Sequence, residues 1–214
     1  MALLIDSADI TDIRRALGLG FVTGVTTNPS LVAKTGQPGM AVLQEILGLT
    51  SGPVFFQVTA GTAEGRAEQA REISRLAPQQ IHVKIPATTE NIALAAHLRK
   101  EGIQCALTAI SSPAQAYLAS QAGATYIAPY VNRLTHSLGD GVAVVRKCAA
   151  ILLGSRTRIL AASLKSVDEV VETLLAGAHD ITIPLDLILS LGEHELSQKA
   201  IEEFAAAGQA AGPD

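Results

Sequence analysis

The sequence predicts an α/β fold in which eight parallel strands, each followed by a helix, close into one barrel. Short apolar runs alternate with amphipathic segments along the whole 214-residue chain. This is the pattern of strands that are buried on both faces and covered by helices. The length suits one domain with a large core, and no linker, low-complexity stretch or change of composition marks a second one. We therefore expect a single domain over residues 1–214.

Eight strands are expected where short apolar runs are bounded by turn residues. They cover residues 3–6, 21–25, 53–58, 81–85, 103–108, 125–128, 158–162 and 180–183. A glycine precedes three of them, in the stretches Glu-Gly-Ile, Gln-Ala-Gly-Ala-Thr and Leu-Ala-Gly-Ala-His. Each glycine stands where a helix has to end in a left-handed residue before the next strand begins.

Helices are expected between the strands, where apolar residues recur at helical spacing. They cover residues 9–17, 40–49, 62–76, 89–100, 113–121, 141–153, 167–175 and the short segment 185–191. A further C-terminal helix is expected over 196–206, followed by a frayed small-residue tail, 207–214. A doubly wound open sheet shares this alternation, but no Gly-x-Gly-x-x-Gly follows the first strand. The prediction is a (β/α)8 (TIM) barrel with an extra C-terminal helix.

Composition narrows the classes of function. The net charge is −4 without a basic stripe, which argues against nucleic-acid binding. The two cysteines, Cys105 and Cys148, lie far apart in apolar sequence, so we expect buried thiols and a reducing compartment. No apolar run is long enough to span a bilayer, and Asp6 interrupts the first run too early for a signal peptide. A cytoplasmic protein without membrane contact is expected.

A lysine on the fourth expected strand is the most informative residue. In Ile81-His82-Val83-Lys84-Ile85-Pro86 the odd positions are aliphatic, so His82 and Lys84 share the opposite face. If helices cover the aliphatic face, Lys84 points into the barrel, where burial lowers the pKa of its amine and allows attack on a carbonyl. The alternative is a lysine that guards an exposed sheet edge. We expect His82, one layer deeper, to be a hydrogen-bonded core residue.

Polar residues stand at the carboxyl ends of most of the other strands, where barrels of this kind hold their active sites. Each has a structural explanation when taken alone: Asp6 suits a helix cap, for instance, and Asn28 a turn. A ring of them around one lysine predicts a site. The ring consists of Asp6, Thr26, Thr27, Asn28, Gln57, Thr108, Tyr130, Arg133, Ser163 and Lys165.

Strand alternation supports the ring at two places. On the third strand it places Gln57 on the same face as Phe55, and on the seventh it places Ser163 with Ala161, opposite Leu160. Other chemistries fit poorly. The five histidines lack metal-ligand spacing, and the chain has neither a Gly-x-Ser-x-Gly elbow nor a Walker loop.

Several segments resemble the transaldolase family and, more narrowly, its small subgroup that contains the bacterial fructose-6-phosphate aldolases. They are Val25-Thr26-Thr27-Asn28-Pro29-Ser30-Leu31, the Lys84 strand, Ala128-Pro129-Tyr130-Val131-Asn132-Arg133, Ala161-Ala162-Ser163-Leu164-Lys165 and Ile183-Pro184-Leu185. The resemblance runs from Leu3 to about Phe204. It implies a (β/α)8 barrel and a Schiff-base mechanism on Lys84 without metal or cofactor. It also implies sugar-phosphate and dihydroxyacetone-type ligands and a homo-oligomer, commonly a pentamer or decamer.

Three positions resemble the aldolases more than typical transaldolases. Gln57 stands where transaldolases carry glutamate, Tyr130 where they carry phenylalanine, and Ala106-Leu107-Thr108 where they tend to carry asparagine. The resemblance therefore implies cleavage of fructose 6-phosphate to dihydroxyacetone and glyceraldehyde 3-phosphate. Transaldolase, which transfers the dihydroxyacetone unit to erythrose 4-phosphate, is the alternative, and a non-catalytic sugar-phosphate-binding barrel is a third. The short loop expected at 109–112 departs from the aldolases and leaves the acceptor open.

This interpretation gives each polar residue an expected role. Lys84 forms the Schiff base, and Tyr130 is the acid/base, acting through a water held by Gln57 and Thr108. Asp6 orients hydroxyl groups and assists proton transfer beside the lysine. The expected substrate-binding residues are Thr26, Asn28, Arg133, Ser163 and Lys165, with the phosphate on the last three.

Overall fold

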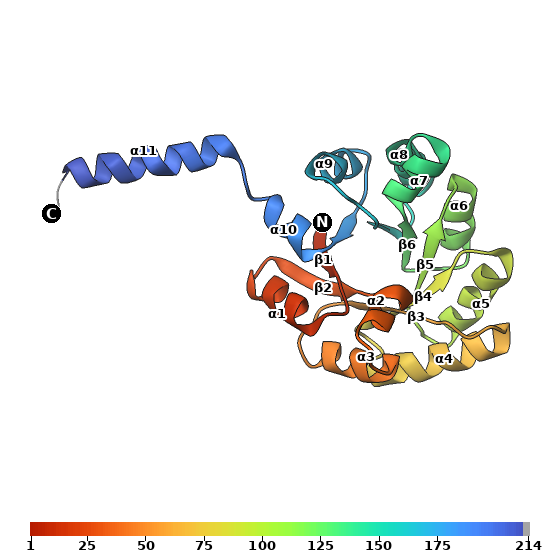
Figure 1. Ribbon diagram of the computed structural model, residues 1–214. Helices are drawn as coiled ribbons and strands as arrows, with labels where there is room; N and C mark the ends of the chain where they lie inside the picture. The colour runs from red at the N-terminus through yellow and green to blue at the C-terminus, as the bar shows by residue number, and fades with distance from the viewer. Residues whose placement is uncertain (212–214) are drawn as a thin grey trace.

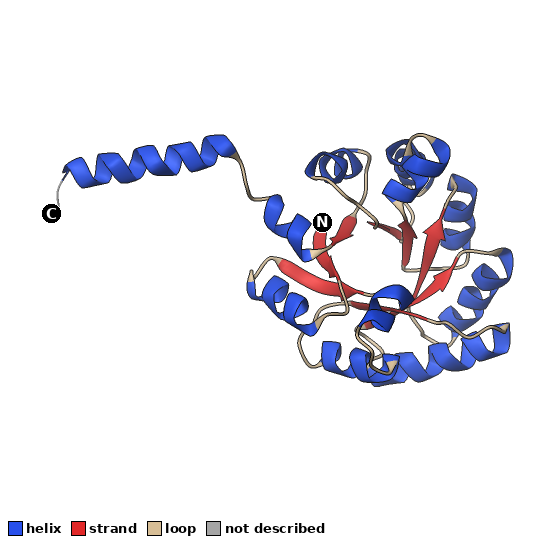
Figure 2. Cartoon of the chain, viewed as in Figure 1, coloured by secondary structure: helices blue, strands red, loops and turns tan. Residues whose placement is uncertain are grey.

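The computed structural model describes residues 1–211, and the side chains of 1–207. Eight parallel strands form one closed barrel in sequence order, with β8 beside β1 (Figure 1, Figure 2). The strands are β1 (Ala2–Asp6), β2 (Val22–Thr26), β3 (Val54–Gln57), β4 (Ile81–Pro86), β5 (Cys105–Ile110), β6 (Tyr126–Pro129), β7 (Arg158–Ala161) and β8 (Asp180–Ile183). The predicted (β/α)8 barrel is confirmed.

Helices surround the barrel, and one extends away from it (Figure 1). They are α1 (Ile10–Gly18), α2 (Pro29–Lys34), α3 (Gly39–Leu47), α4 (Ala63–Leu76), α5 (Thr89–Lys100), α6 (Pro113–Gln121), α7 (Val131–Leu138), α8 (Gly141–Ile151), α9 (Val167–Leu175), α10 (Leu185–Ser190) and α11 (Glu195–Ala211). Gly102, Gly123 and Gly177 have φ of 83°, 75° and 99°, so the three predicted left-handed positions are confirmed. None of the described helices is long and apolar enough to cross a membrane.

The structure corrects the predicted elements in three places. Helices α2 and α7 were not expected; each begins within three residues of the end of a strand, and the start of α2, Asn28-Pro29, also suits a turn. Strand β5 continues to Ile110 through an irregularity after Thr108, so the expected loop at 109–112 is half strand. The expected frayed tail is wrong for residues 207–211, which continue α11, and 212–214 lie outside the described residues.

The core has two parts. A large aliphatic cluster fills the space between the outer faces of the strands and the helices. A small cluster inside the barrel joins Leu4, Phe55, Ala106 and Leu160, which come from β1, β3, β5 and β7. Layers built from alternate strands are typical of this fold, and they leave the barrel filled below the carboxyl ends of the strands. The site is therefore confined to that end.

Candidate active site

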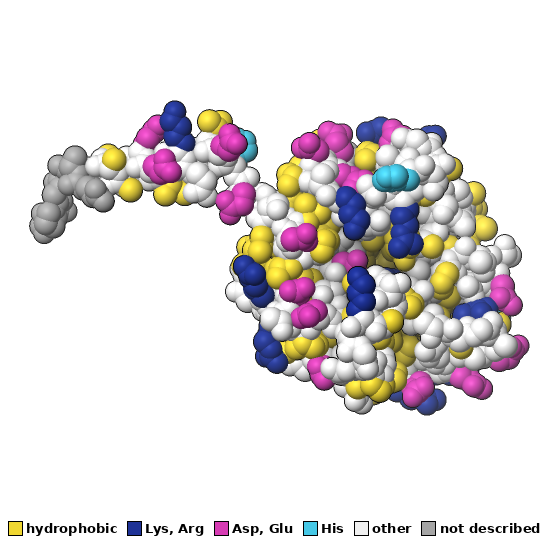
Figure 3. Space-filling view, viewed as in Figure 1, with side chains coloured by type: hydrophobic (Ala, Val, Ile, Leu, Met, Phe, Trp, Pro, Cys, Tyr) yellow, Lys and Arg dark blue, Asp and Glu magenta, His cyan; other side chains and the backbone are white. Residues whose placement is uncertain are grey.

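A cavity of about 530 Å³ opens at the carboxyl ends of the strands. Its lining includes nine of the ten residues that the sequence singled out as catalytic or substrate-binding: Asp6, Asn28, Gln57, Lys84, Thr108, Tyr130, Arg133, Ser163 and Lys165. Figure 3 shows the hollow with Lys and Arg side chains around it. The tenth residue, Thr26, is buried and does not line the cavity.

Lys84 projects from β4 into the barrel, as strand alternation predicts. β4 pairs with both β3 and β5, so the alternative of an edge lysine is wrong. The side chain is only 5% exposed, and Nζ donates a hydrogen bond to the Thr27 carbonyl at 2.7 Å. Burial lowers the pKa of the amine to about 8, although the Asp6 carboxylate raises it. Roughly a tenth of the amine is therefore neutral at pH 7, and a neutral amine can attack a carbonyl.

Asp6, at the end of β1, is the acidic residue of the cavity. Burial raises the pKa of its carboxyl group, while Lys84 and a hydrogen bond from Thr26 oppose this shift. Thr26 Oγ1 donates to Asp6 Oδ1 at 2.7 Å and lies 2.6 Å from Thr182 Oγ1. Thr26 thus fixes the position of the Asp6 carboxylate through a hydrogen bond. Among the described residues, Asp6 and Lys84 are not in direct contact, so the carboxylate remains available to a ligand.

Tyr130 follows β6 and also lines the cavity. Thr108 Oγ1 donates to the Tyr130 hydroxyl at 2.7 Å, and the Arg133 guanidinium lies 4.9 Å from the centre of the Tyr130 ring. Burial raises the pKa of this phenol, while Thr108 and Arg133 lower it. The phenol is therefore protonated near neutral pH, and two groups beside it are placed to stabilise its anion. This is a suitable environment for a proton relay.

The backbone is strained at two residues of the lining. Ala109 and Ser163 have φ of 57° and 61°, in the left-handed region that non-glycine residues rarely adopt. Ala109 lies at the irregularity of β5, directly after Thr108. Ser163 follows the end of β7, beside the bridge between Tyr130 and Ala162. Such strain is concentrated at functional sites, where the surrounding structure holds the residue in place.

The structure corrects one prediction about β7. Leu160 lies in the inner cluster and Ala161 in the outer core, so the predicted alternation has the two faces reversed. Ser163 nevertheless lines the cavity, because β7 ends at Ala161 and the positive φ of Ser163 turns the chain back. Alternation cannot predict the direction of a side chain beyond the end of a strand.

Sequence reasoning missed a fourth cationic residue of the cavity, Lys34 on α2. Two signals could have revealed this helix. Asn28 Oδ1 accepts a hydrogen bond from Leu31 N at 3.0 Å as the N-cap, and Pro29 occupies the first helical turn. The Asn-Pro pair is therefore a helix start that brings Lys34 to the mouth. The other lining residues that were missed are Pro29, Ser30, Leu31, Pro86, Ala109 and Ala162.

His82 is a core residue, as expected. Its ring stacks on Phe55 with the centroids 4.6 Å apart, and Nδ1 lies 2.9 Å from Thr125 Oγ1. Burial lowers the pKa of this histidine to about 4, so it is neutral near pH 7. Cys105 and Cys148 are buried free thiols, as predicted. Within the described residues, no three His, Cys, Asp or Glu side chains come together as a metal site would require.

Comparison with known proteins points to one family. The family described as "Transaldolase/Fructose-6-phosphate aldolase" matches residues 3–212. A protein of Symbiobacterium thermophilum, named probable transaldolase, is 41% identical over 206 residues, 95% of each chain. Proteins with the same name from Geotalea uraniireducens and Halalkalibacterium halodurans are 39% and 41% identical, over 95% of this chain and 96% and 97% of theirs. The chain belongs to the transaldolase/fructose-6-phosphate aldolase family.

Proposed function

We propose that the protein is a class I aldolase that reversibly cleaves fructose 6-phosphate to dihydroxyacetone and glyceraldehyde 3-phosphate. One observation carries this proposal: Lys84, a buried amine with a pKa lowered to about 8, lines a cavity together with Tyr130, Thr108 and Gln57. A desolvated amine beside a phenol relay suits Schiff-base chemistry on a ketose. A non-catalytic sugar-phosphate-binding barrel would not require a buried lysine whose amine has a lowered pKa.

The proposed reaction has three steps. The neutral Lys84 amine adds to carbon two of the ketose, and loss of water gives an iminium ion. The bond between carbons three and four then breaks as the hydroxyl of carbon four loses its proton. This step releases glyceraldehyde 3-phosphate and leaves its electron pair in an enamine on Lys84. Protonation of the enamine at carbon three and hydrolysis of the iminium release dihydroxyacetone and restore the amine.

Tyr130 is proposed to relay the proton of the carbon-four hydroxyl through a water held by Gln57 and Thr108. The hydrogen bond from Thr108, 2.7 Å long, and the Arg133 guanidinium both favour the transient phenolate. Asp6, whose carboxylate acts on the Lys84 amine, is proposed to move protons during formation and hydrolysis of the iminium. Burial raises the pKa of this carboxyl group, which makes it a better proton acceptor than an exposed aspartate.

Substrate binding is proposed to use the two sides of the cavity. Arg133, Lys165 and Ser163 lie after β6 and β7 and would bind the phosphate, because a guanidinium fork suits phosphate oxygens. Lys34 adds a further cation at the mouth. The Oδ1 of Asn28 is occupied by Leu31 N, so its Nδ2 would donate to the terminal hydroxyl of the donor unit.

Transaldolase is the second candidate, and the printed names of the similar proteins favour it. The two activities share the enamine and differ in whether water or an aldehyde consumes it. Gln57 and Tyr130, which resemble the aldolases, favour release to water. The test is to incubate the protein with fructose 6-phosphate alone and follow glyceraldehyde 3-phosphate. Turnover over many enzyme equivalents supports the aldolase, whereas release only after addition of erythrose 4-phosphate supports transaldolase.

We also propose that the protein acts as a homo-oligomer in the cytoplasm. Helix α11 extends away from the barrel (Figure 1) and exposes Leu196, Ile201 and Phe204, which are 70%, 59% and 74% exposed. An apolar surface on a projecting helix is typical of a subunit contact. Light scattering over a range of concentrations tests this, and a stable monomer would contradict it.

A further inference from the structure

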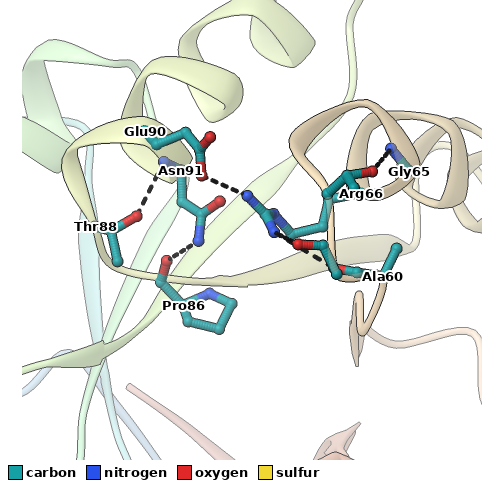
Figure 4. A network of polar contacts seen from close by, with 9 residues as sticks. Ala60, Gly65, Arg66, Pro86, Thr88, Glu90 and Asn91 are labelled. Carbon is teal, nitrogen blue, oxygen red and sulfur yellow. Dashed lines mark hydrogen bonds and ion pairs between the residues drawn. The ribbon is translucent and has the colours of Figure 1, made fainter.

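A partly buried polar network lies beside the cavity, next to the carboxyl ends of β3 and β4 (Figure 4). Arg66, on α4, donates through Nη1 to the carbonyl oxygens of Ala60 at 3.4 Å and Gly61 at 3.1 Å, in the loop after β3. Its Nη2 donates to Glu90 Oε2 at 2.6 Å, in the first turn of α5. One guanidinium therefore ties the loop that follows β3 to the helix that follows β4.

Asn91 extends this network to the end of the strand that carries Lys84. Its side chain is buried, and Nδ2 donates to the Pro86 carbonyl at 2.9 Å. The Lys84 carbonyl accepts from Val58 N at 3.1 Å. The Pro86 carbonyl is two residues further along β4, so it points to the same side as the Lys84 carbonyl. It lies beyond the point where β3 ends. A side-chain amide thus provides the hydrogen bond that a neighbouring strand would otherwise give.

Two buried atoms of the network that lack hydrogen-bond partners indicate the orientation of the Asn91 amide. Arg66 Nε and Asn91 Oδ1 are buried without a hydrogen-bond partner, one a donor and the other an acceptor. Figure 4 shows the Asn91 amide turned toward the Arg66 guanidinium. With Oδ1 toward Arg66 and Nδ2 toward Pro86, each atom faces a group of the complementary kind, whereas the flipped amide would face two groups of its own kind. Arg66 therefore favours the orientation in which Asn91 holds Pro86.

We propose that Asn91, oriented by Arg66, is a positioning residue for Lys84, because it fixes the Pro86 carbonyl and with it the end of β4. Pro86 lines the cavity two residues after Lys84, so movement of this segment admits water to the amine and loosens its contact with the Thr27 carbonyl. The inference rests on the proposed Schiff-base role of Lys84. It adds that two residues outside the cavity control how the amine is presented.

Two substitutions separate positioning from stability. Asn91→Asp keeps the shape and gives Arg66 a charged acceptor, but its carboxylate cannot donate to Pro86. Asn91→Ala removes both contacts. Both variants should lower kcat for fructose 6-phosphate cleavage about tenfold with KM within about twofold, because the misplaced group is the amine and not the phosphate site. The melting temperature of each variant gives its folded fraction, and kcat is compared per folded protein.

Gln80→Ala is the matched control at the other end of the same strand. Gln80 Nε2 donates to the Thr50 carbonyl at 2.6 Å, so the variant loses the same kind of amide–carbonyl bond just before β4 begins. It should lower the melting temperature without changing kcat. An equal loss of kcat in Gln80→Ala and in the Asn91 variants would overturn the proposal, because general loosening of β4 would then explain both.

A readout without substrate keeps the inference separate from the proposed function. Trace methylation of lysines with formaldehyde and cyanoborohydride, followed by peptide mass spectrometry, gives the pH midpoint of Lys84 itself. In Asn91→Ala this midpoint should rise from about 8 toward the ordinary 10.5. An unchanged midpoint together with unchanged kcat overturns the inference. A wild type that never traps dihydroxyacetone overturns the proposed function, while the methylation profile still tests the positioning.

A second variant serves if Asn91→Ala does not fold. Arg66→Lys keeps a charge for Glu90 but lacks Nε, and it should raise the pH midpoint of Lys84 by a smaller amount.

Discussion

The carboxyl and amino ends of the barrel hold buried charge differently. At the amino ends, Arg158 Nε and Nη2 donate to Asp180 Oδ2 and Oδ1, both at 2.8 Å, and Ala2 N donates to Oδ1 at 2.6 Å. At the carboxyl ends, Lys84 is buried and Asp6 is partly buried, and the described residues show no ion pair between them. The first arrangement satisfies its own charges, and the second leaves them for a ligand. We infer from this difference that the amino ends serve stability and that the carboxyl ends, where barrels of this kind hold their active sites, serve chemistry.

The largest effects come from substituting methionine at each end. Lys84→Met should abolish cleavage of fructose 6-phosphate, because the nucleophile is gone. It should also raise the free energy of unfolding at pH 7 by about 1–3 kcal/mol, because a desolvated amine with a pKa of about 8 is replaced by an apolar side chain. Activity assays and urea unfolding measure the two effects. A loss of stability in Lys84→Met would contradict the division of stability and chemistry between the two ends of the barrel.

Arg158→Met should give the opposite result. It leaves the buried Asp180 carboxylate without its cation, which should lower the free energy of unfolding by about 3 kcal/mol. This is the lower end of the usual cost of breaking a buried ion pair, because the Arg158 side chain is half-exposed. The folded variant should cleave fructose 6-phosphate at a rate close to that of the wild type. Urea unfolding and a kcat corrected for folded fraction provide the test. A tenfold loss of kcat would show that the two ends are not independent.

Tyr130→Phe sharpens the assignment within the carboxyl end. It removes the hydroxyl that accepts from Thr108 but keeps the ring under Arg133. The kcat should fall by about 10²–10⁴, the usual contribution of a positioned acid/base, while KM stays within about threefold. Steady-state kinetics with fructose 6-phosphate measure both parameters. An equal loss in kcat and in phosphate-substrate affinity would indicate a packing role for Tyr130 instead.

The pH dependence of Schiff-base formation gives a smaller effect with a defined sign. The folded-state pKa of Lys84, about 8, is below its ordinary 10.5, so neutral amine accumulates as pH rises through 8. The rate of borohydride trapping at limiting dihydroxyacetone should therefore rise about tenfold from pH 6 to pH 7 and level off above pH 8. The folded state also binds fewer protons at Lys84, so this group's contribution to stability increases between about pH 8 and 10.5. A trapping rate that is flat from pH 6 to 8 would contradict the lowered pKa.

Gln57→Glu should have the smallest effect on the overall rate. A carboxylate can hold the water near Tyr130 differently from an amide, which should raise transfer to erythrose 4-phosphate relative to release of dihydroxyacetone. The ratio of the two products, measured with fructose 6-phosphate and erythrose 4-phosphate together, is the readout. Gln69→Glu, at a residue whose side chain accepts from Thr59 and Ala60 outside the cavity, is the matched control. An unchanged ratio in Gln57→Glu would remove Gln57 as the residue that separates the two activities.

How far the sequence predicts this molecule depends on where regular structure ends. Within the strands, alternation correctly placed Lys84, Gln57 and His82, because the period of two is a property of extended backbone. Past the strand ends it failed. Ser163 lines the cavity through a positive φ, and Lys34 enters through a helix that starts at a strand end. On β7 the four-residue strand carried too little pattern to show that Leu160 points inward.

The most direct test of the account locates the adduct. The protein is incubated with dihydroxyacetone, reduced with borohydride and digested, and peptides are mapped by mass spectrometry, with Lys84→Met treated in parallel. One reduced adduct per chain is expected, on the peptide that contains Lys84, and none in the variant. An adduct that persists in Lys84→Met, or that lies on Lys34 or Lys165 in the wild type, would contradict the assignment of Lys84 as the nucleophile.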